Sequence, residues 1–168
     1  MRKLIYFIFF VLLSFELNAK NNPPFSNIIE YDKPKDYGEI VFEDFEGNTI
    51  NLQEYKSKIY ILNFWATWCA PCKKEMPSLD KLNNNDNIEV FAINVEVKNQ
   101  KKTKKFFNDL KIKNLSIYFD TELKLTKLLS LRGLPTTVIL NKDTKEVARI
   151  IGEVDFNDFN LLNWLLDI

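Results

Sequence analysis

The chain has 168 residues, of which 46% are hydrophobic and 27% charged, and its formal net charge is zero. This length is sufficient for one domain with a hydrophobic core. Because Lys and Arg are balanced by Asp and Glu, no basic excess indicates a nucleic-acid partner.

The chain contains two cysteines and no histidine. Without histidine it can form neither a Ser-His-Asp triad nor a Cys-His protease pair nor a histidine-ligated metal site. A structural zinc site typically takes four ligands from Cys and His, so a single copy of this chain cannot complete one. We therefore expect neither a metal site nor a cofactor.

The first 19 residues follow the three-part pattern of a secretory signal peptide. Arg2 and Lys3 give a positive start, residues 4–13 are an unbroken apolar run, and Ala19 is a small residue at the end. The run is shorter than the roughly 20 residues of a membrane-spanning helix, which favours cleavage near Ala19 over an uncleaved signal anchor. Both alternatives predict an exported protein of the periplasm or cell envelope, soluble or anchored to the inner membrane by its N-terminus.

Residues 20–37 are polar and contain three prolines, so we interpret them as a linker that precedes a domain over residues 38–168. The domain is expected to begin with a hairpin formed by residues 40–42 and 49–51. Residues 59–66 follow as a nearly continuous apolar run, which is typical of a central strand buried on both faces.

Helices and strands are expected to alternate after this strand. We predict helices over 69–82, 100–110, 122–131 and 156–166, and strands over 88–95, 115–119, 136–140 and 147–151. Pro77 lies within the first helix and should kink it, and Asp155 is a candidate cap of the last one. The alternation indicates parallel crossovers, whereas the last two strands are too close for one and should be antiparallel. The predicted fold class is α/β, a central mixed sheet flanked by helices with an N-terminal hairpin extension.

Cys69 and Cys72 are the residues expected to carry the chemistry, because they follow the buried strand and begin a helix. A thiolate is the reactive form of cysteine, and the positive end of a helix stabilises an anion. The spacing lets Cys72 reach back and close a small disulfide. Cys69, at the exposed end, should attack a partner disulfide, and Cys72, one turn deeper, should resolve the mixed disulfide. A structural staple is the weaker interpretation, since so small a loop restricts the unfolded chain little.

The sequence resembles the thioredoxin superfamily, and within it the exported TlpA/ResA-like branch. Residues 63–77 carry the resemblance as Asn-Phe-Trp-Ala-Thr-Trp-Cys-Ala-Pro-Cys-Lys-Lys-Glu-Met-Pro, and residues 134–137 as Leu-Pro-Thr-Thr. The similarity covers about residues 38–166 and implies a thioredoxin-like fold and a thiol–disulfide oxidoreductase.

Further site residues follow from this resemblance. Pro135 matches the family's cis-proline, which faces the disulfide, whereas the sequence alone also allows a trans proline that opens a strand. Leu134 would then offer backbone groups to an incoming peptide. Trp68 is expected beside the cysteines, an interpretation compatible with a core aromatic residue.

Glu75 matches an acidic residue that tunes the cysteine pair in ResA-like proteins. It lies one helical turn beyond Cys72, where a carboxylate would raise the pKa of a thiol and accept its proton. A solvated surface glutamate is the alternative. Asn63 occupies the position at which cytoplasmic thioredoxins carry a buried acid, so Glu75 is the better candidate for handling a proton.

The expected function is the reduction of disulfides in exported proteins with Cys pairs. The resemblance implies apocytochrome c or copper-site assembly proteins as partners, and an oxidising compartment requires a membrane electron donor. The alternatives are a net oxidant of folding proteins and a chaperone that binds Cu(I) through its thiols. A peroxiredoxin ranks lower, because it typically uses a lone cysteine. The lysines of residues 101–105 are interpreted as a solvated helix face.

Overall fold

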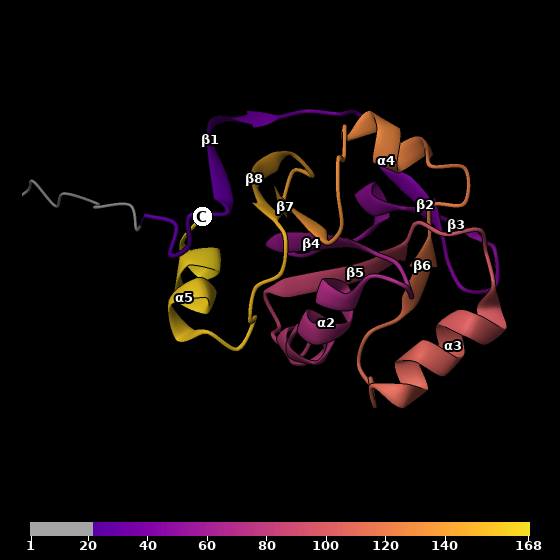
Figure 1. The fold of residues 1–168 in the computed structure, drawn as a ribbon. Coiled ribbons are helices and arrows are strands. Elements are labelled where there is room, and N and C mark those ends of the chain that lie inside the picture. The colour runs from indigo at the N-terminus through magenta and orange to yellow at the C-terminus, as the bar shows by residue number, and fades with distance from the viewer. Residues whose placement is uncertain (1–21) are drawn as a thin grey trace, which may run out of the picture.

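The computed structural model describes residues 22–168, so the expected signal segment, residues 1–19, lies outside the described residues. A single eight-stranded sheet has the order β1-β8-β7-β4-β5-β6-β2-β3 (Figure 1). Its strands are β1 (Ile28–Lys35), β2 (Val41–Glu43), β3 (Thr49–Asn51), β4 (Ile59–Trp65), β5 (Ile88–Asn94), β6 (Ile117–Phe119), β7 (Thr136–Asn141) and β8 (Glu146–Ile151). The helical elements are η1 (Leu52–Glu54), α2 (Ala70–Leu82), α3 (Gln100–Asp109), α4 (Lys124–Leu128) and α5 (Phe159–Asp167). Within residues 22–168, no helix has both the length and the apolar character needed to cross a membrane.

The strand pairing confirms the predicted mixed sheet. The central strand β4 pairs in parallel with β5 and antiparallel with β7. β5 pairs in parallel with β6, and β7 pairs antiparallel with β8. The pairing follows from connection length, because α2 provides the crossover that a parallel pair needs, whereas a short turn joins β7 to β8. The expected hairpin is present as the antiparallel pair β2 and β3.

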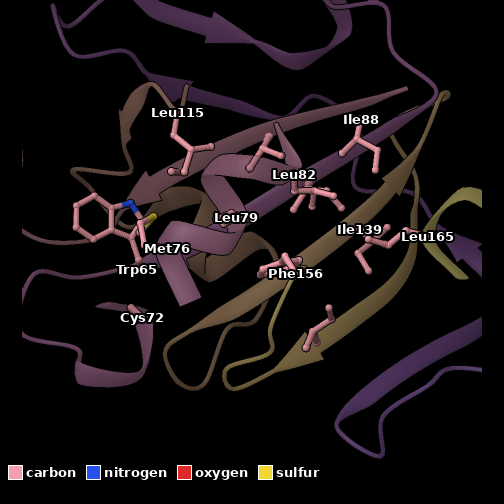
Figure 2. Packing of buried hydrophobic residues seen from close by; sticks show 14 of the residues in the cluster. Trp65, Cys72, Met76, Leu79, Leu82, Ile88, Leu115, Ile139, Phe156 and Leu165 are labelled. Carbon is pink, nitrogen blue, oxygen red and sulfur yellow. The ribbon is translucent and has the colours of Figure 1, made fainter. Parts of the chain in front are cut away.

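Two hydrophobic cores lie on the two faces of the sheet, and β4 contributes to both. Side chains alternate along a strand, so Ile61 and Trp65 face the core shared with α2, α3 and α5. Leu62 and Phe64 face the second core, to which α4 and the β2–β3 hairpin contribute. Figure 2 shows the first core, in which the side chains of α2 pack over the sheet. All residues of β4 are buried, as a strand covered on both faces requires.

The linker interpretation of residues 20–37 is wrong for Ile28–Lys35, which form the edge strand β1. This strand pairs antiparallel with β8, and Ile28 is buried opposite Ile150. Pro34 obscured the strand in the sequence, but an edge strand tolerates proline because one of its sides forms no sheet hydrogen bonds. Just beyond β1, the Tyr37 hydroxyl donates to buried Glu146 at 2.6 Å. The domain therefore begins before residue 38.

Two helices differ from their predicted bounds. The helix expected over 122–131 is the shorter α4, because Leu123 and Ser130 adopt positive φ values on either side of it. The last helix begins later than expected, and Asp158 caps it by accepting from the Asn160 and Leu161 amides. Asp155, the predicted cap, instead accepts from the Asn157 amide at 2.9 Å.

Candidate active site

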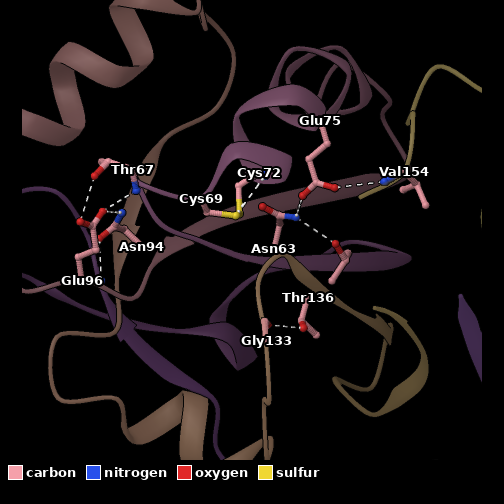
Figure 3. Close-up of a disulfide and its surroundings, with 11 residues drawn as sticks. Asn63, Thr67, Cys69, Cys72, Glu75, Asn94, Glu96, Gly133, Thr136 and Val154 are labelled. Atoms are coloured by element: carbon pink, nitrogen blue, oxygen red, sulfur yellow. Dashed lines mark hydrogen bonds between the residues drawn. A yellow bond between two sulfur atoms is a disulfide. The ribbon is translucent and has the colours of Figure 1, made fainter. Parts of the chain in front are cut away.

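The two cysteines form a disulfide at the junction of β4 and α2. Cys69 is the N-cap residue of α2, and the Cα atoms of Cys69 and Cys72 are 5.3 Å apart. Cys72 is fully buried, whereas 5% of the Cys69 surface remains exposed. The predicted pairing is confirmed, and Figure 3 shows the disulfide that joins the two cysteines. Cys69 is the more accessible of the two residues.

The start of α2 places a hydrogen-bond donor on Cys69. The backbone amide of Cys72 donates to the Cys69 Sγ at 3.2 Å, within the first turn of the helix. Free amides and the positive helix end both favour a negatively charged sulfur at this position. The local geometry therefore supports a thiolate on Cys69 when the disulfide is open.

Glu75, on α2 one helical turn beyond Cys72, is buried rather than solvated, with only 2% of its surface exposed. Its Oε1 accepts from the Asn63 amide at 2.8 Å, and its Oε2 accepts from the Val154 backbone amide at 3.3 Å. Burial raises the pKa of Glu75 to about 7, although both hydrogen bonds act in the opposite direction. A carboxyl group with such a pKa can give or take a proton near neutral pH.

Asn63 lies on β4, on the face that α2 covers, and it is fully buried. Its Nδ2 donates to Glu75 and also to the Thr137 hydroxyl, at 3.0 Å, on the neighbouring strand β7. The amide thus links the helix that carries the cysteines to the centre of the sheet. In Figure 3 it lies between Glu75 and the disulfide.

The Leu134–Pro135 peptide bond is cis, as the resemblance implied. Pro135 directly precedes β7, in which Thr136 pairs with Phe64 near the end of β4. Since the cysteines follow that same end of β4, the cis peptide and the disulfide share one edge of the sheet. Pro135 is buried and Leu134 is half-buried.

Trp68 is 70% exposed, so it is not a core aromatic residue. It lines a surface hollow together with Val97, which is 88% exposed, and with Lys98 and Lys102. A large apolar side chain next to Cys69 in the sequence is thereby presented to solvent.

Glu96 is a site neighbour that sequence reasoning missed. Its carboxylate accepts from the Thr67 amide at 2.5 Å and from the Thr67 hydroxyl at 3.0 Å, and it also binds Lys102. These contacts hold the loop between β4 and Cys69. The pairing of Trp65 with Asn94 indicates this contact, because Thr67 and Glu96 each lie two residues beyond that pair. The sequence alone does not give this pairing, so it could not predict the contact.

A Cys-X-X-Cys disulfide at a helix N-terminus, beside a cis-proline on a mixed sheet, defines the class of thiol–disulfide oxidoreductases with a thioredoxin-like fold. The family model described as Redoxin matches residues 23–162. The thiol–disulfide oxidoreductase ResA of Bacillus cereus is 34% identical over 122 residues, which is 71% of this chain and 69% of that protein.

Solved structures agree with this class. A DsbF homologue from Corynebacterium diphtheriae is 28% identical with a TM-score of 0.69, covering 88% of this chain and 97% of its own. An exposed lipoprotein thioredoxin from Streptococcus pneumoniae is 25% identical with a TM-score of 0.67, covering 78% of this chain and 100% of its own. The chain belongs to the Redoxin family, and it is a thiol–disulfide oxidoreductase of the ResA-like type.

The raised pKa of Glu75 predicts a pH-dependent stability. The carboxyl group has an ordinary value of 4.5 and titrates at about 7 in the folded protein, so between these values the folded state holds a proton that the unfolded state releases. The stabilising contribution is fully present below 4.5 and is lost as the pH rises through about 7. The free energy of unfolding should fall by up to about 3 kcal/mol over that window.

Urea unfolding of the oxidised protein across this pH range measures the effect. Glu75→Gln cannot ionise, so the difference between wild type and variant isolates Glu75 from all other titrating groups. Parallel pH profiles for the two proteins would show that Glu75 titrates normally.

Proposed function

We propose that this protein is a net reductant of disulfides in exported partner proteins. The observation that carries the proposal is the buried Glu75 carboxyl group, which is held beside the cysteine pair by Asn63. A negative charge there disfavours a thiolate on the buried Cys72. Strong oxidants of this class owe their high potential to a stabilised reduced form, so a carboxylate near the thiols favours the reducing direction.

In the proposed cycle, the Cys69 thiolate attacks one sulfur of a partner disulfide, and the other partner sulfur leaves as a thiolate that takes up a proton. Cys72 then loses its proton to the Glu75 carboxylate and attacks the Cys69 sulfur. This step forms the Cys69–Cys72 disulfide and releases the second partner sulfur as a thiolate, which takes the proton back from Glu75. The partner gains two electrons and two protons, and the enzyme dithiol is oxidised.

The partner segment would bind between Trp68 and the cis peptide. Trp68 offers an exposed apolar surface on one side of Cys69. Leu134 and Pro135 lie at the same edge of the sheet, and Leu134 would hydrogen-bond the extended backbone around the partner cysteine.

The proposed setting is the periplasm or cell envelope, either in solution after signal cleavage or anchored at the inner membrane. The signal-like residues 1–19 and the likeness to an exposed lipoprotein thioredoxin support it. The partners would be exported proteins with Cys pairs, such as apocytochrome c or copper-site assembly proteins. Because exported compartments are oxidising, a membrane donor has to return Cys69 and Cys72 to the dithiol form.

The roles of the two cysteines predict opposite results for their serine variants. Cys69→Ser should abolish the reduction of insulin disulfides, because the attacking sulfur is lost. Cys72→Ser should accumulate mixed disulfides with partner proteins, because the resolving sulfur is lost. Non-reducing electrophoresis followed by mass spectrometry measures both. If trapping requires Cys69→Ser instead, the two roles are reversed.

The direction of electron flow is tested by the reduction potential of the Cys69–Cys72 pair. We expect about −270 mV or lower, as for thioredoxin, when the pair is equilibrated with thiol–disulfide buffers. A potential near about −120 mV would instead identify a net oxidant.

Trp68→Ala should weaken partner binding while leaving the fold intact. We expect KM for a disulfide substrate to rise about tenfold, equal to about 1.4 kcal/mol, with kcat unchanged. Phe159→Ala is the matched control, since Phe159 is an aromatic residue on α5 with 72% of its surface exposed. Equal effects of the two substitutions would exclude a binding role for Trp68.

A further inference from the structure

The Asn63 side-chain oxygen is a buried acceptor without a hydrogen-bond partner. Asn63 is fully buried, and no donor among residues 22–168 lies within hydrogen-bonding reach of its Oδ1. Buried polar groups are nearly always hydrogen-bonded, so an exception in the core requires an explanation. This oxygen lies in the site but takes no part in the hydrogen bonds that Asn63 makes to Glu75 and Thr137.

The orientation of the Asn63 amide is fixed by its neighbours. Its Nδ2 donates to the Glu75 Oε1 at 2.8 Å and to the Thr137 Oγ1 at 3.0 Å. While Glu75 is ionised, a flipped amide would place Oδ1 against its carboxylate oxygen, and two acceptors repel each other. Both donor hydrogens are therefore in use, and the oxygen points the other way.

The Asn63 Oδ1 points toward the disulfide. Figure 3 shows the Asn63 oxygen on the side of the sulfur atoms, with its nitrogen turned toward Glu75. A disulfide carries no hydrogen and cannot donate to this oxygen. A thiol carries one, so the missing donor exists only after the disulfide has opened.

We propose that Asn63 is a positioning residue whose Oδ1 accepts a hydrogen bond from the Cys72 thiol in the reduced protein. The inference rests on the dithiol–disulfide cycle of the proposed function, although not on its direction. Opening the disulfide takes two electrons and two protons from an external dithiol, which itself becomes a disulfide. One of these protons ends on the Cys72 Sγ and is directed at Oδ1.

The consequence is an asymmetry between the two sulfurs. Cys69 Sγ has a hydrogen-bond donor, the Cys72 amide, which favours its thiolate. Cys72, by contrast, would face an acceptor oxygen and the Glu75 carboxyl beyond it, which favour its thiol. Asn63 would therefore keep the proton on the resolving sulfur and leave the negative charge on the attacking one.

Asn63→Leu tests the proposal, because leucine has a similar size and no acceptor. In the oxidised protein the substitution removes an unpartnered oxygen, and in the reduced protein it removes a hydrogen bond. We therefore expect the exchange equilibrium with dithiothreitol to shift about tenfold toward the protein disulfide, which is a potential about 30 mV more negative.

The equilibrium is measured about one unit above the Glu75 pKa of about 7, so that Glu75 of the wild-type protein is mainly a carboxylate and the Asn63 amide keeps this orientation. Thr137→Val is the matched control, because it removes the other acceptor of the Asn63 Nδ2 and leaves Oδ1 in place. Its equilibrium should remain within about twofold of wild type, a change of less than about 10 mV. An unchanged equilibrium in Asn63→Leu, or an equal shift in Thr137→Val, would overturn the proposal.

A second measurement leaves Asn63 intact and so does not depend on the folding of Asn63→Leu. In Cys69→Ser, Cys72 carries the single thiol, and its S–H stretching band in the infrared should lie below that of a free cysteine. A band at the free-thiol position would contradict the hydrogen bond. Neither measurement uses a partner protein, so a failure here is separate from a failure of insulin reduction.

Discussion

The burial of β4 on both faces is the constraint on which the rest of the structure depends. Every residue of this strand is buried, so the strand contributes to both cores and fixes where the chain leaves the sheet. The chain leaves at Trp65 and enters α2 through Cys69. The Cys69 sulfur therefore lies where a rigid strand end meets the positive end of a helix dipole. The neighbouring strands β5 and β7 bring Glu96 and the cis peptide to the same edge.

A buried polar group is costly in such a core, and this site contains both Asn63 and Glu75. Burial raises the pKa of Glu75 because it disfavours the charged carboxylate. The hydrogen bonds from Asn63 and Val154 lower this pKa again, but by less than burial raises it. The remaining shift places the group in the pH range where proton transfer to a thiol is feasible. The same burial that destabilises the charged carboxylate thus suits Glu75 to the proton exchange that we propose with Cys72.

The edge of the sheet shows a similar balance between polar and apolar contacts. Glu146 is fully buried on β8. Its carboxylate accepts hydrogen bonds from the Arg149 Nε at 2.7 Å and from the Tyr37 hydroxyl. A buried carboxylate needs such partners to offset its desolvation. These contacts join the segment after β1 to β8, which explains how a polar, proline-containing stretch becomes part of the domain.

The sequence by itself determined the α/β class, the cysteine pair and its place after a buried strand, because apolar runs and a Cys-X-X-Cys spacing are local patterns. It left open whether Glu75 was buried or solvated and whether Trp68 belonged to the core. It also failed to identify β1. Those questions were decided by the tertiary structure, because burial depends on which elements pack together. Only the packing of α2 on the sheet places Glu75 against Asn63, and only pairing with β8 turns Ile28–Lys35 into a strand.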